Sequence, residues 1–490
     1  MPAIITNKFR IHNSEQFFES FKEASGNTYY LGIGRSLPYS TATRADGRTD
    51  NQGTDVLPIT PADNLNAESF TYDDLLAVKK VSDTDIAFVA PRRNWVTGTT
   101  YDIYRHDYGE RITGTTTLQT SNSGVSNLFD ANFYVLNSSR NVYKCLDNNN
   151  NGASTVEPTG TNSSSIISTA DGYKWKYMYS LSASQQSNFL STDFMAVSTN
   201  TDVSSNAVDG AINIVKIKTA GSGGTNGTHT SIPIRGDGSS GTVSVTISSN
   251  AISAVTVTNV GSGYTIAYIT LADINSAGGG SLSGAELDCI IEPKGGHGFD
   301  AKKELGGFFI MLNTTFTGAE AANSGDFTVS NDFRKVFLLR DPKSGGSAAS
   351  ANTLRATKAI RFASSPTPGS FDVDEEINQA STGAVGKVVE YDSTNRILYY
   401  IQTRFNDEGA DSNGNITAFS GVNVVTGQST SATGTPDADS DSAVNNVSFT
   451  NGYATSELDA DQGDVIYLES RTPIARASDQ SENVKLIVEF

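Results

Sequence analysis

Residues 173–179 read Tyr-Lys-Trp-Lys-Tyr-Met-Tyr, and this stretch decides the fold class. Aromatic residues alternate with lysine and methionine at a period of two, which is the side-chain period of a β-strand. The four aromatic rings therefore fall on one face of the strand. In a β protein such a stripe is more often a core face with a solvated opposite side than a platform for nucleic-acid bases. The stretch thus predicts a strand that turns its rings into a core.

The rest of the 490-residue chain has the same character. Ser, Thr, Asn and Gly together make up about 40% of it, well above their ordinary usage. Short runs of Val, Ile, Thr and Tyr recur between Gly, Asn and Ser, while stretches rich in Ala, Leu, Glu and Lys are nearly absent. We therefore predict a mainly β, multidomain chain of antiparallel sandwich-like or barrel-like domains, with a small α+β portion at the N-terminus.

Individual elements can be placed from apolar runs and turn residues. The expected strands cover residues 29–34, 86–90, 385–391, 397–403, 465–470 and 484–490. A helix is expected over 14–24, because Asn13 and Gln16 stand at capping-box spacing before an aromatic stripe. A second helix is expected over 69–81, where four apolar residues share one face. The pair Gly32 and Gly34 lacks the third glycine and the following helix of a dinucleotide-binding fold.

Residues 212–225 and 252–265 are two copies of one pattern, offset by 40 residues. Each copy is an alternating apolar run that leads into a Gly-Ser-Gly turn. Two copies are too few for a solenoid. We therefore interpret residues 205–292 as a small β module with a further hairpin between the copies.

The composition excludes several classes of protein. A net charge of -18 repels phosphate backbones and argues against nucleic-acid binding. No apolar stretch approaches the roughly 20 residues that span a bilayer, and the N-terminus lacks the pattern of a secretory signal, so we expect no membrane contact. Cys145 and Cys289 lack the paired spacing of a metal or redox site and are expected to be half-buried thiols in a reducing compartment.

The motifs of common enzymes are missing as well. The sequence holds no GxSxG elbow, no Walker loop and no HExxH, and its four histidines are scattered singly. His297, in a glycine-rich loop that we expect to be flexible, is at most a weak candidate. We therefore predict no catalytic residues, no metal and no cofactor.

Two acidic segments resemble parts of cation sites. Asp147, Asn149 and Asn151 match the first half of a calcium loop, but its twelfth position is Pro158 instead of the required Glu. A second segment has aspartates at the alternating positions Asp437, Asp439 and Asp441. Solvated polar loops are the favoured interpretation of both, and a bound cation stays open.

Arg92 and Arg93 stand next to each other, two residues before Trp95. Adjacent guanidinium groups beside an indole could grip a carboxylate or a phosphate of a ligand. In so acidic a protein, the favoured interpretation is ion pairing with a neighbouring acidic surface.

Several segments together are similar to a known family, the baseplate wedge subunit called gene product eight of T-even-type contractile-tailed phages. The segments, in chain order, are Asn7 to Arg10; Gly34, Arg35, Ser36 and Pro38; Val89, Pro91, Arg92, Arg93 and Trp95; Tyr143 to Asp147; Glu157 and Pro158; Asp171, Gly172, Tyr173, Trp175 and Tyr177; Asn331, Phe333 and Arg334; and a C-terminal set from Gly463 to Phe490. The resemblance rests on their common order over residues 7–181 and 463–490.

The resemblance implies a structural protein of the virion. It implies a mainly β homodimer that is assembled in the host cytoplasm, sits in each wedge of the tail baseplate and contacts other wedge proteins. Our candidates for contact residues are Arg35, Arg92, Arg93 and Trp95, since Arg and Trp most often anchor interfaces. A carbohydrate-binding adhesin module is the alternative, suggested by the Gly-Ser-Gly repeats and tyrosines, and a polysaccharide hydrolase is a third possibility.

The sequence departs from the family at about residues 205–295 and 346–450, and such modules resemble the decorations of large-genome marine and cyanobacterial phages. The expected division of the chain is a wedge-family region at 1–204, an inserted β module at 205–295, a return to the family at 296–345, a second inserted module at 346–450 and C-terminal family strands at 451–490.

Overall fold

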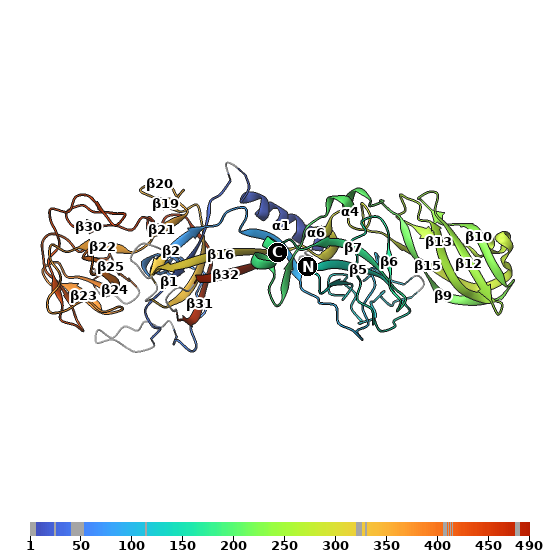
Figure 1. Ribbon diagram of the computed structural model, residues 1–490, viewed down its shortest axis with the longest axis horizontal. Coiled ribbons are helices and arrows are strands. Elements are labelled where there is room, and N and C mark those ends of the chain that lie inside the picture. Colours follow the sequence, from blue (N-terminus) through green and yellow to red (C-terminus); the bar gives the residue numbers. More distant parts are fainter. Residues whose placement is uncertain are drawn as a thin grey trace. The chain divides into compact units, whose positions relative to one another are not determined.

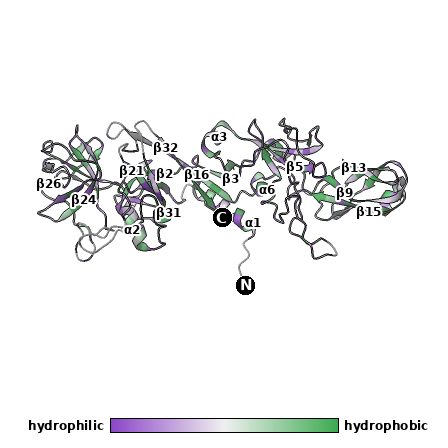
Figure 2. Cartoon of the chain, turned by 90° about the horizontal axis from the view of Figure 1, so that it is seen from below, coloured by the Kyte–Doolittle hydropathy of each residue, from purple (hydrophilic) through white to green (hydrophobic). Residues whose placement is uncertain are grey.

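The computed structural model confirms a mainly β protein with a helix near its N-terminus (Figure 1). It describes residues 6–23, 26–40, 53–112, 115–319, 326–328, 331–404, 409, 411, 413, 415–475 and 481–490. In Figure 2 hydrophobic residues, in green, gather on strands such as β9 (Ile212–Gly224) and β16 (Phe309–Ala319). No helix of the described part is long and apolar enough to cross a membrane.

The chain divides into two compact units, and each unit is assembled from separate segments. Unit 1 comprises residues 1–18, 87–311 and 487–490, and unit 2 comprises residues 19–86 and 312–486. The boundaries fall inside regular elements. These elements are α1 (Asn7–Ser20), β3 (Ile86–Pro91), β16 and β32 (Ser481–Glu489). A sheet of order β17-β16-β3-β8, in which β32 also pairs with β16, includes three of them. Its short strands are β8 (Phe194–Ala196) and β17 (Phe327–Thr328).

Unit 1 contains the aromatic stretch at residues 173–179. The stretch 173–179 lies in β7 (Tyr173–Ser180), within a sheet of order β4-β5-β7-β6. The other strands are β4 (Tyr134–Leu136), β5 (Asn141–Asn148) and β6 (Ile167–Ser168). Tyr173 and Trp175 pack into an aromatic core, as predicted. The opposite face is not solvated, because Lys176 and Met178 are buried too.

Short helices complete the frame of unit 1. They are α3 (Ala183–Phe189), α4 (Thr201–Ser205) and α6 (Ala301–Leu305). Polar residues begin each of them. Ser182 and Gln185 form a reciprocal capping box at α3, and Asn200 and Asp300 cap α4 and α6 by accepting backbone N–H bonds.

Residues 212–291 form a cluster of long antiparallel strands around one apolar core (Figure 1, green to yellow-green). Its ladders are β15-β9, β10-β12-β13 and β11-β14. The strands are β10 (Gly227–Pro233), β11 (Arg235–Gly236), β12 (Thr242–Ser248), β13 (Ala251–Asn259), β14 (Ala267–Tyr268) and β15 (Gly280–Ile291), with the helical turns α5 (Leu271–Ile274) and η1 (Asn275–Gly279) before β15.

The two copies of the repeat share their backbone conformation but differ in pairing. In both, the first and third positions of Gly-Ser-Gly have positive φ: 71° and 77° at Gly221 and Gly223, 63° and 75° at Gly261 and Gly263. The second copy follows β13 as an extended stretch in which Ser262 pairs with Ser239, so the predicted turn is not formed there. The first is not a turn, because β9 continues through it and pairs with β15.

Unit 2 is organised by a sheet of order β21-β2-β1-β18-β31. The strands are β1 (Tyr29–Gly34), β2 (Leu75–Lys80), β18 (Phe333–Arg340), β21 (Thr353–Arg355) and β31 (Asp464–Ile474). The predicted strand at 29–34 is confirmed. The predicted helix at 69–81 is wrong: α2 (Leu65–Asp73) ends earlier, and the apolar run 75–80 is β2, held between β1 and β21.

The second sheet of unit 2 has the order β27-β26-β23-β24-β25-β22-β30 (Figure 1, orange to brown). Its strands are β22 (Lys358–Arg361), β23 (Glu376–Gln379), β24 (Ala384–Asp392), β25 (Ile397–Ile401), β26 (Val425–Gly427), β27 (Thr433–Gly434) and β30 (Tyr453–Ala454). The predicted hairpin at 385–403 is β24 and β25. Unit 2 also contains two small hairpins, β19 (Lys343–Ser344) with β20 (Ser347–Ala348), and β28 (Ala443–Val444) with β29 (Val447–Ser448).

Helix α1 starts earlier than predicted. It begins at Asn7 and ends at Ser20, instead of covering 14–24; residues 24 and 25 lie outside the described part. Its aromatic side chains pack against other rings of the protein. Phe17 lies 5.3 Å from Phe490 and Phe18 lies 4.5 Å from Phe88, measured between ring centroids. The C-terminus therefore lies beside α1 (Figures 1 and 2).

Candidate interface residues

Residues 92–96 form an extended segment directly after β3. Its backbone is held by three hydrogen bonds: Arg92 N to Asp193 O (2.7 Å), Leu136 N to Arg93 O (2.7 Å) and Trp95 N to Leu136 O (2.9 Å). The segment is therefore fixed between β4 and the loop before β8, and the orientation of its side chains is set by the fold.

Both arginines of this segment donate to neutral oxygens. Arg92 donates from Nε to Asn94 Oδ1 (2.9 Å) and from Nη1 to the carbonyl of Ser191 (2.7 Å). Arg93 donates from Nη2 to the carbonyl of Phe129 (3.0 Å), and its guanidinium lies 4.9 Å from the ring centroid of Tyr134. Within the described residues, neither arginine has a carboxylate partner within 4.0 Å. Two half-buried arginines at adjacent positions of the segment thus have no ion-pair partner among the described residues.

Trp95 is a fixed, partly buried side chain. Its indole N–H donates to Ser154 Oγ (3.0 Å), and its ring packs against the aromatic core that contains Tyr101 and Trp175. The next residue, Val96, is 56% exposed. The segment thus combines an anchored indole and an exposed valine with two arginines, residue types that are enriched at protein interfaces.

Arg35 lies elsewhere, in unit 2, and its side chain is 1% exposed. It donates to the carbonyl of Pro38 (3.1 Å) and lies 3.8 Å from the carboxylate of Asp74, which also pairs with Lys335 (3.0 Å). The backbone of Arg35 has a φ of 57°, a strained value for a residue with a side chain. This burial leaves the guanidinium no surface for a partner, so we do not carry the interface prediction for Arg35 further.

A second buried charged cluster lies in unit 1, and sequence reasoning missed it. Lys144 on β5 forms an ion pair with Glu304 on α6, and both are buried. Burial alone would raise the pKa of Glu304, but the charge of Lys144 and the hydrogen bonds from His297 and Lys144 together outweigh burial and lower this pKa to about 2. The partners are 160 residues apart in the chain, so no local signal announces the pair.

His297 belongs to this cluster. The sequence placed it in a flexible loop, whereas the structure buries its ring against Tyr104, with 4.7 Å between ring centroids. Its backbone N–H donates to Glu292 (2.8 Å). Burial lowers the pKa of His297, and the charge of Lys144 lowers it further. The residue is thus a packed, neutral core histidine.

The two acidic segments are engaged by cationic or backbone partners of the chain. Asp147 accepts from Lys216 (2.8 Å) and lies 3.8 Å from Lys174. Asp437 lies 3.5 Å from Arg361, and Asp441 accepts from the backbone of Asn451 (2.6 Å). The described ranges contain no group of three His, Cys, Asp or Glu residues placed to hold a metal ion. Cys145 and Cys289 are free thiols and are buried, more deeply than expected.

These observations define a class: a mainly β protein in which many charged side chains fix loops and sheet edges. Its unit 1 carries a basic segment without an ion pair among the described residues. The comparison with known families then names the relatives. Residues 3–215 match the family described as Bacteriophage T4, Gp8. No match was found among curated proteins. The family is that of the baseplate wedge, so the protein is a structural component of the phage tail baseplate in the virion.

Proposed function

We propose that the protein joins neighbouring wedge proteins in the baseplate, and pairs with a second copy of itself, through polar interfaces and without catalysis. The family match over residues 3–215 supports a role as a structural wedge subunit. Such a role suits a Ser-, Thr- and Asn-rich acidic surface, because polar interfaces gain strength from complementarity and from many simultaneous contacts.

The observation that carries the proposal is the basic segment of unit 1. Arg92 and Arg93 lie within the matched region and have no carboxylate partner in the described residues, although acidic residues outnumber basic ones by 53 to 35. A guanidinium that has lost part of its hydration gains most from a carboxylate with two oxygens. We therefore propose that an acidic surface of a neighbouring protein pairs with them, and that Trp95 anchors the same contact.

Charge reversal tests this assignment. The variant Arg92→Glu/Arg93→Glu should weaken association with the other wedge proteins or with a second copy by at least about tenfold, which corresponds to 1.4 kcal/mol. Size-exclusion chromatography with light scattering measures the dimer, and mixing with the purified wedge proteins measures assembly.

A matched control separates local contact from overall charge. Lys218→Glu/Arg235→Glu changes the net charge by the same amount in the same unit, at two exposed residues that already have partners in the chain. It should assemble like the unchanged protein. Because the arginines also hold carbonyl groups, Arg92→Gln/Arg93→Gln with a checked melting temperature guards against misfolding. Normal assembly of the folded reversal variant would refute the contact.

The alternative, a carbohydrate-binding module, has less support, because few aromatic side chains are exposed on it. Residues 205–292 contain two tyrosines and no other Phe, Trp or Tyr. Tyr264 is buried, and its hydroxyl donates to the carbonyl of Ile234 (3.0 Å), so only Tyr268 remains exposed for stacking on a sugar. Retention of the protein on a glycan array, lost in Tyr268→Ala, would favour this alternative.

A further inference from the structure

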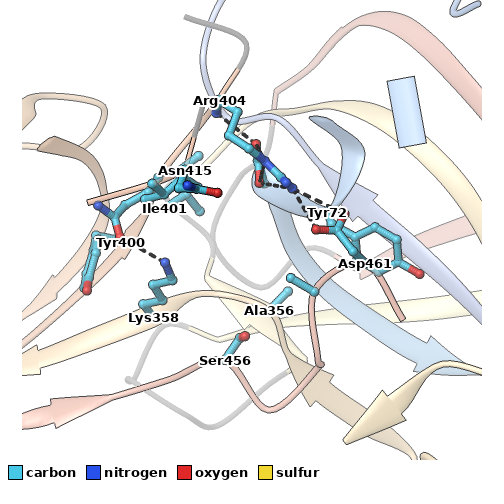
Figure 3. Close-up of a pocket in the computed structure, with 13 residues that line it drawn as sticks. Tyr72, Ala356, Lys358, Tyr400, Ile401, Arg404, Asn415, Ser456 and Asp461 are labelled. Carbon is cyan, nitrogen blue, oxygen red and sulfur yellow. Dashed lines mark hydrogen bonds and ion pairs between the residues drawn. The ribbon is translucent and has the colours of Figure 1, made fainter. Parts of the chain in front are cut away.

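A pocket in unit 2 lies outside the proposed interface. It has a volume of about 220 Å³ and is lined by α2, by β22, by the end of β25 and by the segment that precedes β31 (Figure 3). Lys358 enters it from β22, and Arg404 enters it from the segment after β25 (Figure 3). The two cations differ in how they are compensated.

Arg404 is neutralised within the chain. Its Nε donates to both carboxylate oxygens of Asp73 (3.0 and 2.9 Å), and its Nη2 donates to Asp461 (3.1 Å). The backbone N–H of Arg404 also donates to Asp73 (2.8 Å). Both carboxylate oxygens of Asp73 therefore already accept hydrogen bonds from Arg404.

Lys358 is not neutralised. Its ammonium donates to Gln402 Oε1 (2.9 Å), and no carboxylate of the described residues lies within 4.0 Å of it. An ammonium has three N–H donors, so this contact leaves two that have no hydrogen-bond acceptor among those residues. Burial lowers the pKa of Lys358, which Asp73 partly offsets. The charged form is thus held in the pocket at a desolvation cost.

The orientation of Lys358 is fixed by its acceptor. Gln402 is buried, and its side-chain NH₂ group donates to the carbonyls of Val385 and Thr417 (both 2.9 Å). Both amide hydrogens are committed, so Oε1 must face the lysine. The ammonium is therefore preorganised at one wall of the pocket.

We propose that this pocket binds a small oxyanion, a phosphate or a carboxylate, through the ammonium of Lys358. An oxyanion would accept the remaining N–H bonds of the ammonium, and charge-assisted bonds of this kind are about twice as strong as neutral ones. The volume lies below the roughly 300–1,000 Å³ of pockets for drug-sized ligands. Inorganic phosphate or a short polycarboxylate therefore fits the proposal better than a nucleotide.

Calorimetric titration of the full chain with inorganic phosphate, and separately with citrate, tests the site. The unchanged protein should bind at least one of them, and Lys358→Met should weaken that binding at least about tenfold. Lys387→Met is the matched control, because Lys387 lies on β24 of the same sheet and already pairs with Glu376 (3.0 Å). It should bind like the unchanged protein.

The variant also reports on folding. Because Lys358→Met removes a desolvated charge, its melting temperature without anion should equal or exceed that of the unchanged protein, and anion should raise it less. General salting-out by phosphate would act on all variants alike. Absence of binding by the unchanged protein at about 10 mM of either anion, or equal binding by Lys358→Met, would overturn the proposal.

Discussion

At the scale of single residues, the chain contains a carboxylate without compensation. Glu390 on β24 is half-buried and accepts no hydrogen bond from the described residues. Burial raises its pKa to about 7, and the neighbouring Asp392 adds to the effect. The folded state therefore binds this proton more tightly than the unfolded chain, whose Glu pKa is near 4.5. The resulting stability is present at low pH and is lost as the pH rises from about 4.5 through about 7.

Glu390→Gln should remove this pH dependence. At pH 8 we expect the variant to be more stable by about 1–3 kcal/mol, and at pH 4 it should match the unchanged protein. Urea unfolding at both pH values measures the difference. Glu376→Gln is the control in the same sheet, because it breaks an ion pair with Lys387 and should not stabilise the protein. A Glu390→Gln variant without any gain at pH 8 would show that the carboxylate finds compensation in solution.

At the scale of elements, the pairing of β1 with β18 depends on one glycine. Gly32 lies opposite Phe337, and a Cβ at Gly32 would come within 2.0 Å of the Phe337 ring. Phe337 is completely buried, so its ring has no space to move into. The glycine pair that fails as a dinucleotide motif thus has a packing role in this strand.

Gly32→Ala should therefore destabilise unit 2 by about 1–3 kcal/mol, because overpacking a core forces side chains from their preferred rotamers. Chemical denaturation measures the loss. The double variant Gly32→Ala/Phe337→Leu should lose less than the sum of the two single changes, since the smaller side chain relieves the clash. Strictly additive losses would contradict a direct contact.

The elements also show where sequence reasoning works and where it stops. The strands at 29–34 and 173–179 were predictable because their period or composition fits a single structure. The run 75–80 was ambiguous: its spacing suits a helix, and only the ladders with β1 and β21 decide for a strand. The end of α2 at Asp73 could not be read locally either, although Asn64, which caps it by accepting from Ala67 (3.0 Å), is a recognisable start signal.

The candidate site, too, could be predicted from the sequence only in part. Arg92, Arg93 and Trp95 were predictable as contact residues from their type and adjacency. Their lack of an internal counter-charge was not, because it depends on which of many acidic residues the fold brings near. Lys358 gave no signal at all, since its acceptor Gln402 is 44 residues away.

At the scale of the whole molecule, no single stretch of chain makes up either unit. Unit 1 needs residues 1–18, the long middle segment and the last four residues, 487–490. Sequence patterns describe continuous segments of the chain. They therefore cannot reveal that the two ends of a 490-residue chain share a core. The contacts of Phe490 show how the last residues take part. Its ring lies 5.3 Å from that of Phe17, its N–H donates to Phe308 O (3.1 Å), and its carbonyl accepts from Arg10.

Phe490→Ala should therefore destabilise unit 1, even though it changes only the terminal residue. We expect a loss of about 1–3 kcal/mol, less than for a fully buried phenylalanine because this ring is half-buried. Differential scanning calorimetry should show the transition of unit 1 moving to lower temperature. Phe299→Ala is the matched control in the same unit, because that ring is 52% exposed and its removal should cost little. Equal effects of the two variants would mean that the Phe490 ring contributes little to the stability of unit 1. This result would contradict the expectation that unit 1 depends on both ends of the chain.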